Sequence, residues 1–207
     1  YLPDPIRHGT HLMADPSYIV DGTLTDGEAW VALASTTLTS DAASVTFTDP
    51  SDGSSLDWCQ FMDLVVIMYW KGATTSDPMR TGLLQLNGDT TATNYVIETL
   101  YGDGSSVSAV YWNENGLAYS GLLGNDGTTG TAFSATITTF FDVNSGKYKS
   151  FMVENASDYD GAGVVQITGG SYKTQAPISS ILFKSDSGNI LDESRFDLFG
   201  VLPRMVA

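Results

Sequence analysis

The chain contains 207 residues and carries a formal net charge of −15, with 42% hydrophobic but only 16% charged residues. This length suffices for one sizeable domain whose core needs no disulfide or metal. The negative charge disfavours nucleic acid as a partner, because phosphate binding draws its free energy from lysine and arginine. We also expect no membrane segment, since no run reaches the roughly eighteen apolar residues of a membrane span.

Residues 1–29 are expected to form an extended arm. They contain Pro3, Pro5 and Pro16 with several glycines, and they show no sustained periodicity. No secretory leader is recognisable there. The apolar residues of the arm are too sparse to build a core and are predicted to contact a partner. They are Leu2, Ile6, Leu12, Met13, Tyr18 and Ile19.

Residues 30–202 are predicted to form a single all-β domain, followed by a short tail at 203–207. Runs rich in Val, Ile, Thr, Phe and Tyr are separated by clusters of Gly, Asp, Asn and Ser, a pattern typical of strands and turns. We expect strands at about 30–38, 44–48, 61–70, 81–87, 94–101, 106–112, 131–140, 148–155, 163–170, 178–184 and 194–200. Short strands joined by turns such as Asn87-Gly88 favour a jelly-roll-like antiparallel β-sandwich.

The alternation within these strands predicts the core. Apolar and polar residues alternate in 44–48, 178–183 and 195–199, so one face of each strand should be buried and the other solvated. The run 64–70 lacks alternation and is expected to be a central strand covered on both faces. The predicted core residues are Val45, Phe47, Leu64, Val66, Met68, Leu84, Leu86, Phe140, Phe151, Val153, Ile178, Ile181, Phe183, Phe196 and Leu198.

The residues able to support catalysis or metal binding do not form a recognisable set. The single cysteine, Cys59, lies among bulky residues and is interpreted as a small buried hydrophobe. It is not expected to be a nucleophile, because both histidines, His8 and His11, lie in the arm. The spacing of His8 and His11 is not followed by further metal ligands. We therefore predict no catalytic residue, no metal and no cofactor.

Two acidic loops, 49–57 and 158–161, leave alternatives open. Each gathers oxygen atoms around a glycine, as calcium loops do, but neither matches the EF-hand pattern. Ordinary turn chemistry is the preferred interpretation, and a calcium site is the alternative. The segment Asn155-Ala156-Ser157 fits a glycosylation sequon, a short pattern that also arises by chance.

Some residues are of the types that hydrolyse or bind carbohydrates. Many acidic residues could form a glycosidase pair, yet nothing marks an acid and a nucleophile. Aromatic side chains could stack on sugars, although on strands such residues more often belong to the core. The candidates are Trp58, Trp70, Tyr111, Trp112, Tyr119 and Tyr172.

Four segments resemble a recurrent domain of tailed-bacteriophage structural proteins. They are 33–38 with 44–47, then 63–66, then 84–90 with 94–95 and 100–106, and finally 177–201. The most specific are Leu84-Gln85-Leu86-Asn87-Gly88-Asp89 and Ser194-Arg195-Phe196-Asp197-Leu198-Phe199-Gly200. The resemblance implies a virion component of tail fibres, appendages or capsid-associated proteins, and it implies no catalytic residues. The segments themselves contain turns and alternating strands, so we interpret them as fold-determining.

Together these observations predict a non-enzymatic bacteriophage virion protein, most consistent with a capsid-surface decoration or small appendage subunit. We expect it to bind other virion proteins and like copies of itself. A homo-oligomer, with a trimer favoured, is expected because arm and edge strands would otherwise stay exposed. The alternative is a tail-fibre or tail-tip module that binds a receptor or a host-surface glycan.

Overall fold

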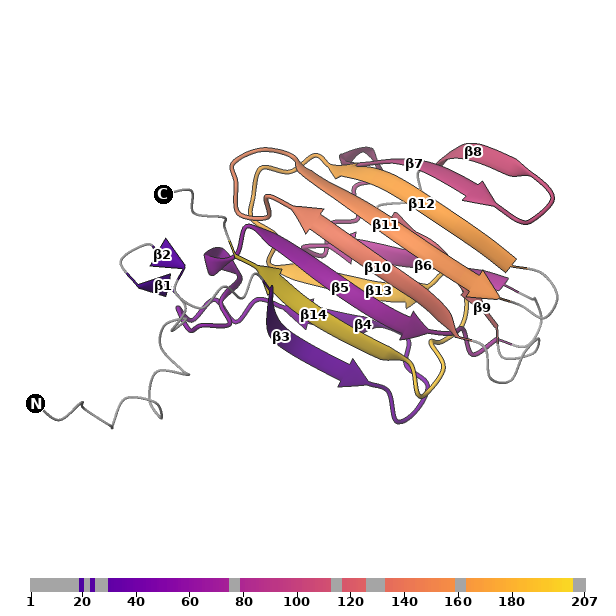
Figure 1. Cartoon of the computed structure of the whole chain (residues 1–207), viewed down its shortest axis with the longest axis horizontal. Coiled ribbons are helices and arrows are strands. Elements are labelled where there is room, and N and C mark those ends of the chain that lie inside the picture. Colours follow the sequence, from indigo (N-terminus) through magenta and orange to yellow (C-terminus); the bar gives the residue numbers. More distant parts are fainter. Residues whose placement is uncertain are drawn as a thin grey trace, which may run out of the picture.

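The computed structural model describes residues 19–20, 23–24, 30–74, 79–112, 117–125, 133–158 and 163–202. They form two antiparallel sheets packed as a sandwich, which confirms the predicted fold class (Figure 1). The larger sheet has eight strands in the order β3-β14-β5-β10-β11-β12-β7-β8, and the smaller has four in the order β4-β13-β6-β9. The proposed arm lies outside the described residues, apart from a two-stranded pairing of β1 (Ile19–Val20) with β2 (Thr23–Leu24).

The chain crosses repeatedly between the two sheets, which gives the jelly-roll-like connectivity. The strands are β3 (Trp30–Thr37), β4 (Val45–Thr48), β5 (Asp63–Trp70), β6 (Met79–Leu86), β7 (Tyr95–Gly102), β8 (Val107–Trp112), β9 (Ala118–Gly124), β10 (Ser134–Phe141), β11 (Lys149–Asp158), β12 (Gly163–Tyr172), β13 (Ser180–Ser185) and β14 (Arg195–Val201). Two 3-10 turns, η2 (Trp58–Gln60) and η3 (Ala92–Asn94), lie between strands.

All eleven predicted strands are present, and three strands were not predicted: the two-residue strands β1 and β2, and β9 within the sandwich. The sequence of β9, Ala-Tyr-Ser-Gly-Leu-Leu-Gly, has no polar and apolar alternation, and six of its seven residues are buried. Gly121 adopts a φ of +99°, and the pairing of β9 with β6 shifts register at this point. A bulge of this kind breaks the period-2 pattern on which the prediction depends.

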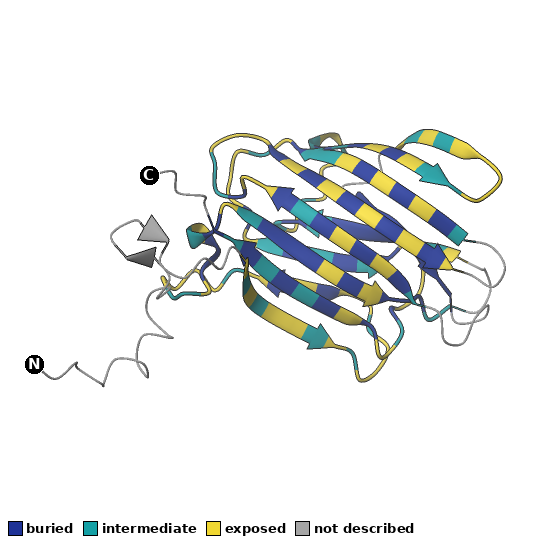
Figure 2. Cartoon of the chain, viewed as in Figure 1, coloured by how far each residue is buried: buried dark blue, intermediate teal, exposed yellow. Residues whose placement is uncertain are grey.

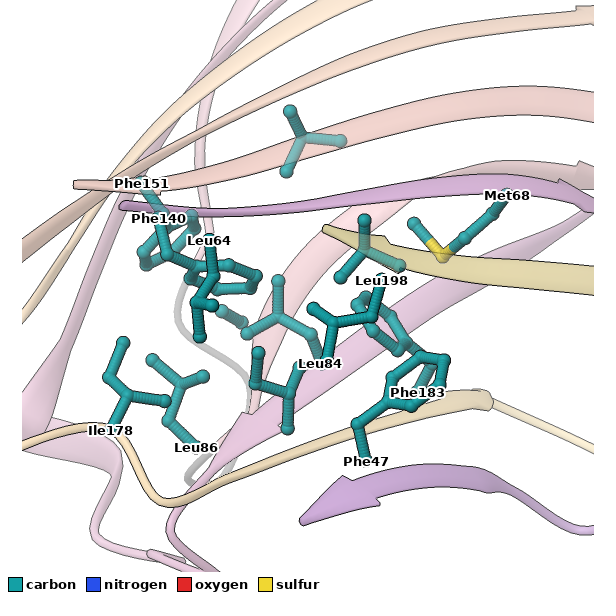
Figure 3. Close-up of a cluster of buried hydrophobic side chains, with 14 of the residues drawn as sticks. Phe47, Leu64, Met68, Leu84, Leu86, Phe140, Phe151, Ile178, Phe183 and Leu198 are labelled. Atoms are coloured by element: carbon teal, nitrogen blue, oxygen red, sulfur yellow. The ribbon is translucent and has the colours of Figure 1, made fainter. Parts of the chain in front are cut away.

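The core lies between the sheets, and all fifteen predicted core residues are buried. Figure 3 shows Leu64, Met68 and Leu198 from the larger sheet facing Leu84 and Phe183 from the smaller one. The alternation that predicted these positions therefore located the inner face of each strand correctly.

The expectation that the strand at 64–70 is covered on both faces is wrong for half of it. Leu64, Val65 and Val66 are buried, but Ile67 is 37% exposed and Tyr69 is 51% exposed. The strand is internal to the larger sheet, with β14 and β10 on either side. Two of its outward side chains, Ile67 and Tyr69, are therefore not covered by another layer of the described residues.

A turn at Asn87 follows β6 and leads the chain from the smaller sheet to the larger one, so the hairpin expected from Asn87-Gly88 is not formed. Asn87 has a φ of +54° and is followed by Gly88 at +65°, as a tight turn of this type requires. The Asn87 Oδ1 atom accepts a hydrogen bond from the Ser179 backbone N–H at 2.8 Å, and Nδ2 donates one to the Pro177 carbonyl at 2.8 Å. These contacts hold the start of β13 against the end of β6, so the side chain has a structural role.

Candidate functional site

The outer face of the eight-stranded sheet is the most distinctive surface of the described residues. It faces the viewer in Figure 2, where exposed and buried positions alternate along each strand. Its exposed or half-exposed apolar side chains come from all eight strands. They are Trp30, Ile67, Tyr69, Leu100, Val107, Tyr111, Ile137, Phe141, Met152, Val165, Ile167 and Phe199. We call this set the outer apolar face.

The strand register places these residues in one continuous row across the sheet. Leu100 pairs with Ile167, Ile167 with Glu154, Glu154 with Ile137, and Ile137 with Ile67. Directly opposed residues on neighbouring antiparallel strands have Cβ atoms about 5 Å apart, so their side chains are in contact range. The row therefore consists of two pairs of adjacent apolar side chains, Leu100 with Ile167 and Ile137 with Ile67, and Glu154 lies between the two pairs.

The outer face of the larger sheet carries five carboxylates and one basic residue. Glu154 lies in the middle of the row, Glu98 lies next to Tyr111 on the neighbouring strand β8, and Asp63 and Asp158 lie at the ends of β5 and β11. The only basic residue of the eight strands' outer positions, Arg195, pairs with Asp197 through a 2.8 Å contact between Nε and Oδ2. Because that pair is satisfied locally, it presents little net charge to a partner.

The opposite surface of the sandwich has a different character. The outward side chains of β4 are Thr46 and Thr48, and those of β13 include Ser180 and Lys184. A polar outer sheet face is the usual outcome in a sandwich whose other face fills the core. The contrast between the two sheets shows that the apolar character belongs to one face specifically.

Aromatic pairs lie at two places on the outer apolar face. Trp30, where β3 begins, packs against Phe199 with ring centroids 5.9 Å apart. Tyr69 stacks on Phe133 at 5.1 Å with an interplanar angle of 21°. Residues 1–29 join the described sandwich at Trp30, and so enter it at an edge of this face.

A second feature is a cavity of about 570 Å³ between the two sheets. It lies where β6 and β9 of the smaller sheet meet β7 and β12 of the larger one. Buried Thr99 and Tyr119 line it, together with Val164 and the half-buried Leu122. Arg80, Tyr101, Asp103 and Asp186 are its more exposed lining residues.

A chain of side-chain hydrogen bonds underlies this cavity. The Tyr119 hydroxyl donates to Gln166 Oε1 at 3.1 Å, and Gln166 Nε2 donates to Thr168 Oγ1 at 3.0 Å. The hydroxyls of Thr168 and Thr99 are 2.9 Å apart. The two ends of the chain, Tyr119 and Thr99, line the cavity, so their polar atoms are held in fixed positions.

The Asp103 carboxylate at this cavity is also fixed by its own turn. It accepts hydrogen bonds from the backbone N–H groups of Ser105 at 2.9 Å and Ser106 at 2.8 Å. These N–H groups, with the two serine hydroxyls, lower the pKa of Asp103 to about 2. Asp103 therefore remains an anion at neutral pH.

The acidic loop 49–57 uses its carboxylates within its own turns. Asp49 Oδ1 accepts from the Trp58 backbone N–H at 2.9 Å, and Asp57 accepts from Gly53 and Cys59 at 2.8 and 2.9 Å. The hydrogen bonds that Cys59 and Gly53 donate lower the pKa of Asp57. Among the described residues, no three His, Cys, Asp or Glu side chains gather closely enough to hold a metal ion. The loop 158–161 and the two histidines, His8 and His11, lie largely or wholly outside the described residues.

The burial predicted for Cys59 is wrong. The side chain is exposed because η2 turns Trp58 into the core and thereby directs the next residue outward. A hydrogen bond to Asp57, followed by desolvation and nearby negative charge, raises the pKa of Cys59 to about 11. The thiol is therefore protonated at neutral pH, which opposes a nucleophilic role.

The sequon and the aromatic candidates are mostly internal. Asn155 is 3% exposed and is fully engaged between the sheets, so it is not an accessible glycosylation site. Of the six aromatic candidates, Trp58, Trp70, Tyr119 and Tyr172 are buried, and Tyr111 is exposed on β8. The side chain of Trp112 lies outside those described.

The sequence analysis did not identify the outer apolar face. The six predicted partner-binding residues, Leu2, Ile6, Leu12, Met13, Tyr18 and Ile19, have no described side chains. A signal for the face was nevertheless present, because 64–70 and 164–167 carry apolar residues on both strand faces. In 64–70 that pattern predicts coverage by a second layer, which is its usual meaning in a single domain, and the sequence analysis makes no prediction from it for 164–167.

Few known proteins are similar to this chain. No family model matches the sequence, and no curated protein matches it. One solved structure is similar, "Crystal structure of Scytalido-glutamic peptidase with a peptide based transition state analog". It is 10% identical to this chain with a TM-score of 0.28, and the match covers 79% of this chain and 66% of that one. The chain thus spans slightly less than two thirds of that peptidase's length.

This finding corrects the expectation that the chain is not an enzyme. The similar protein is a peptidase, so the exclusion of catalysis does not stand. At this identity and TM-score the likeness carries no argument about a reaction or about individual residues. A separate observation concerns membranes: no helix of the described residues is long and apolar enough to cross a bilayer.

Proposed function

We propose that this chain is a structural subunit of a bacteriophage particle and that it binds a second copy of itself through the outer apolar face. The observation that carries the assembly proposal is the row from Leu100 through Ile167 and Ile137 to Ile67. Large contiguous apolar patches on a folded surface mark interaction sites, because leaving them in water costs free energy that burial recovers.

The size of the face supports a second copy as the occupant. Eight strands about 4.8 Å apart, each contributing about eight residues at about 3.3 Å per residue, cover roughly 1,000 Å². That is slightly more than the roughly 800 Å² which each partner buries in a standard protein interface. Since the same patch on two identical chains is self-complementary, one face suffices to build a symmetric pair.

Charge supports the same choice. Each chain carries a net charge of −15, so two copies repel one another unless their contact surfaces are poor in carboxylates. Inside the row Glu154 is the one carboxylate, while Glu98, Asp63 and Asp158 lie around it and Asp197 is paired with Arg195. Apolar contact then outweighs a repulsion that salt screens.

The bacteriophage context of the proposal comes from the sequence segments. The segments around 84–90 and 177–201 resemble those of tailed-phage structural proteins, and Asn87 joins them in space. On this basis we place the chain in the virion, as a capsid-surface decoration or small appendage subunit in contact with other virion proteins. The alternative, a tail-fibre or tail-tip module, places the same face against a receptor.

The test is the mass of the purified chain in solution. Light scattering at micromolar concentration is expected to give a multiple of 22.1 kDa. The same measurement tells whether the oligomer is the trimer that the sequence favours or a dimer. Ile137→Asp should lower the mass to that of a monomer, because it buries a charge in the contact. Thr46→Asp, on the polar outer side of β4, should leave the mass unchanged.

Two outcomes contradict the assembly proposal. One is a 22.1 kDa species for the unmodified chain, and the other is an oligomer that Ile137→Asp does not affect while circular dichroism shows it folded. Deleting residues 1–29 tests whether these residues, and not a second copy, cover the outer apolar face. If they cover the face of their own chain, their removal will create association that the full chain lacks. Immunogold labelling of phage particles tests the virion assignment independently.

A further inference from the structure

We propose that the cavity between β6, β9, β7 and β12 is a binding site for a neutral sugar of one or two rings. The cavity lies between the sheets, and Tyr101, Asp103 and Asp186 are among the residues that line it. This inference concerns a different surface from the outer apolar face and does not depend on the proposed assembly. It rests on the shape of the cavity, its buried hydroxyls and its charged lining residues.

The size and composition of the cavity suit a small polar molecule. Its volume of about 570 Å³ falls within the range of small-molecule sites. Its lining mixes apolar groups, such as Leu122 and Val164, with hydroxyl groups and charges. A sugar ring presents a C–H face for the apolar groups and hydroxyls at its edge for the polar ones.

The buried hydroxyls are the strongest part of the argument. Thr99 and Tyr119 are 3% and 4% exposed, yet both border the cavity. Gln166 and Thr168 connect them behind the surface through the 3.1, 3.0 and 2.9 Å contacts described above. A hydroxyl group can accept and donate hydrogen bonds at once, so these atoms can exchange bonds with ligand hydroxyls without any charge.

The charged lining residues favour a neutral ligand over an anionic one. Asp103 and Asp186 are exposed carboxylates, and they can accept hydrogen bonds from sugar hydroxyls. The same two carboxylates outnumber the one cation of the lining, Arg80, and with the net charge of −15 they oppose a phosphorylated ligand.

The test uses nuclear magnetic resonance of the full chain with free sugars. The probes are lactose, maltose and N,N′-diacetylchitobiose with their monosaccharides, up to about 20 mM, above the millimolar dissociation constants of weak specific binding. At least one should shift the backbone amides of Thr99, Tyr119 and Val164 saturably. Glucose 6-phosphate should shift none of these amides.

Variants distinguish binding in the cavity from binding elsewhere. Asp186→Asn is expected to weaken the affinity for the sugar about tenfold, as loss of one charge-assisted hydrogen bond does. Asp192→Asn, at an exposed turn outside the cavity lining, should leave the affinity unchanged. The inference is overturned if no neutral sugar produces saturable shifts, if the shifts fall on Ile137 and Ile167 instead, or if both variants behave alike.

Discussion

Asn155 on β11 holds both backbone polar groups of Leu122 on β9, which lies in the other sheet. Its Oδ1 atom accepts from the Leu122 N–H at 3.1 Å, and its Nδ2 atom donates to the Leu122 carbonyl at 3.1 Å. Nδ2 also donates to Thr136 Oγ1 at 2.8 Å. The buried amide of Asn155 therefore forms the hydrogen bonds with Leu122 that a neighbouring strand would otherwise form, and it links the two sheets of the sandwich.

Replacing Asn155 with leucine is expected to destabilise the fold by about 1 to 3 kcal/mol. The substitution leaves the Leu122 N–H without its partner, which costs about 1 to 3 kcal/mol, whereas the Leu122 carbonyl keeps the hydrogen bond that the Ser157 hydroxyl donates. The measurement is the free energy of unfolding in urea. Ser150→Ala on the solvent side of the same strand is the control and should change stability by less than about 0.5 kcal/mol.

Neighbouring glycines on β12 should respond very differently to alanine. A Cβ atom at Gly170 would lie 2.0 Å from Cζ of Phe151, whereas one at Gly169 would meet nothing within 4 Å. Because Phe151 is packed in the core, Gly170→Ala should cost about 1 to 3 kcal/mol through overpacking. Gly169→Ala should be neutral or slightly stabilising. Equal melting temperatures for the two variants would show that Phe151 moves easily to make room for the added methyl group.

Leu198→Ala tests the inner face of β14. Leu198 is 1% exposed and belongs to the core between the sheets (Figure 3). Its truncation is expected to lower the free energy of unfolding by about 2 to 5 kcal/mol, as large-to-small core substitutions do. Thr37→Ala on the exposed end of the adjacent strand β3 is the control. An unchanged melting temperature for Leu198→Ala would contradict the packing described here.

The inward-facing side chains of this sandwich could be predicted from the sequence, but the exposure of the outward-facing apolar side chains could not. Period-2 alternation marks the inward positions of β4, β13 and β14, and the core residues predicted on these three strands are all buried. Alternation says nothing about a strand whose two faces are both apolar, such as β5. Ile67 looked like a buried residue, and only the three-dimensional arrangement shows that nothing in the described chain covers it.

The cavity and Cys59 were unpredictable for a different reason. Thr99, Tyr119 and Gln166 come from three strands of two sheets, so their proximity depends on topology that no local pattern encodes. Cys59 lies between Trp58 and Phe61, which are both buried, but a 3-10 turn has three residues per turn and not two. Hydrophobic neighbours therefore did not imply a buried cysteine.

The turn around Asp103 should make stability depend on pH in the acid range. Its pKa lies near 2 in the folded chain, below the ordinary value of 3.8, because the N–H and hydroxyl groups of Ser105 and Ser106 stabilise the anion. A lowered pKa adds stability above pH 3.8, and this contribution is lost as the pH falls towards 2. Asp103→Ala should therefore differ from the unmodified chain at neutral pH and converge with it in acid. Titration of the Asp103 carboxyl carbon by nuclear magnetic resonance gives the midpoint directly, and a midpoint near 3.8 would contradict this account.

Cys59 should react slowly with iodoacetamide although its side chain is exposed. Only the thiolate reacts, and a pKa of about 11 in place of 9.0 lowers the thiolate fraction at neutral pH about 100-fold. The higher intrinsic nucleophilicity of the more basic thiolate recovers part of this loss, so we expect alkylation about tenfold slower than in the urea-unfolded chain. Asp57→Asn keeps an oxygen that can accept from the Cys59 N–H but removes the negative charge, and it should accelerate alkylation towards the unfolded rate. If the native chain and the unfolded chain react equally fast, or if Asp57→Asn has no effect while the fold is retained, then Asp57 does not control this thiol.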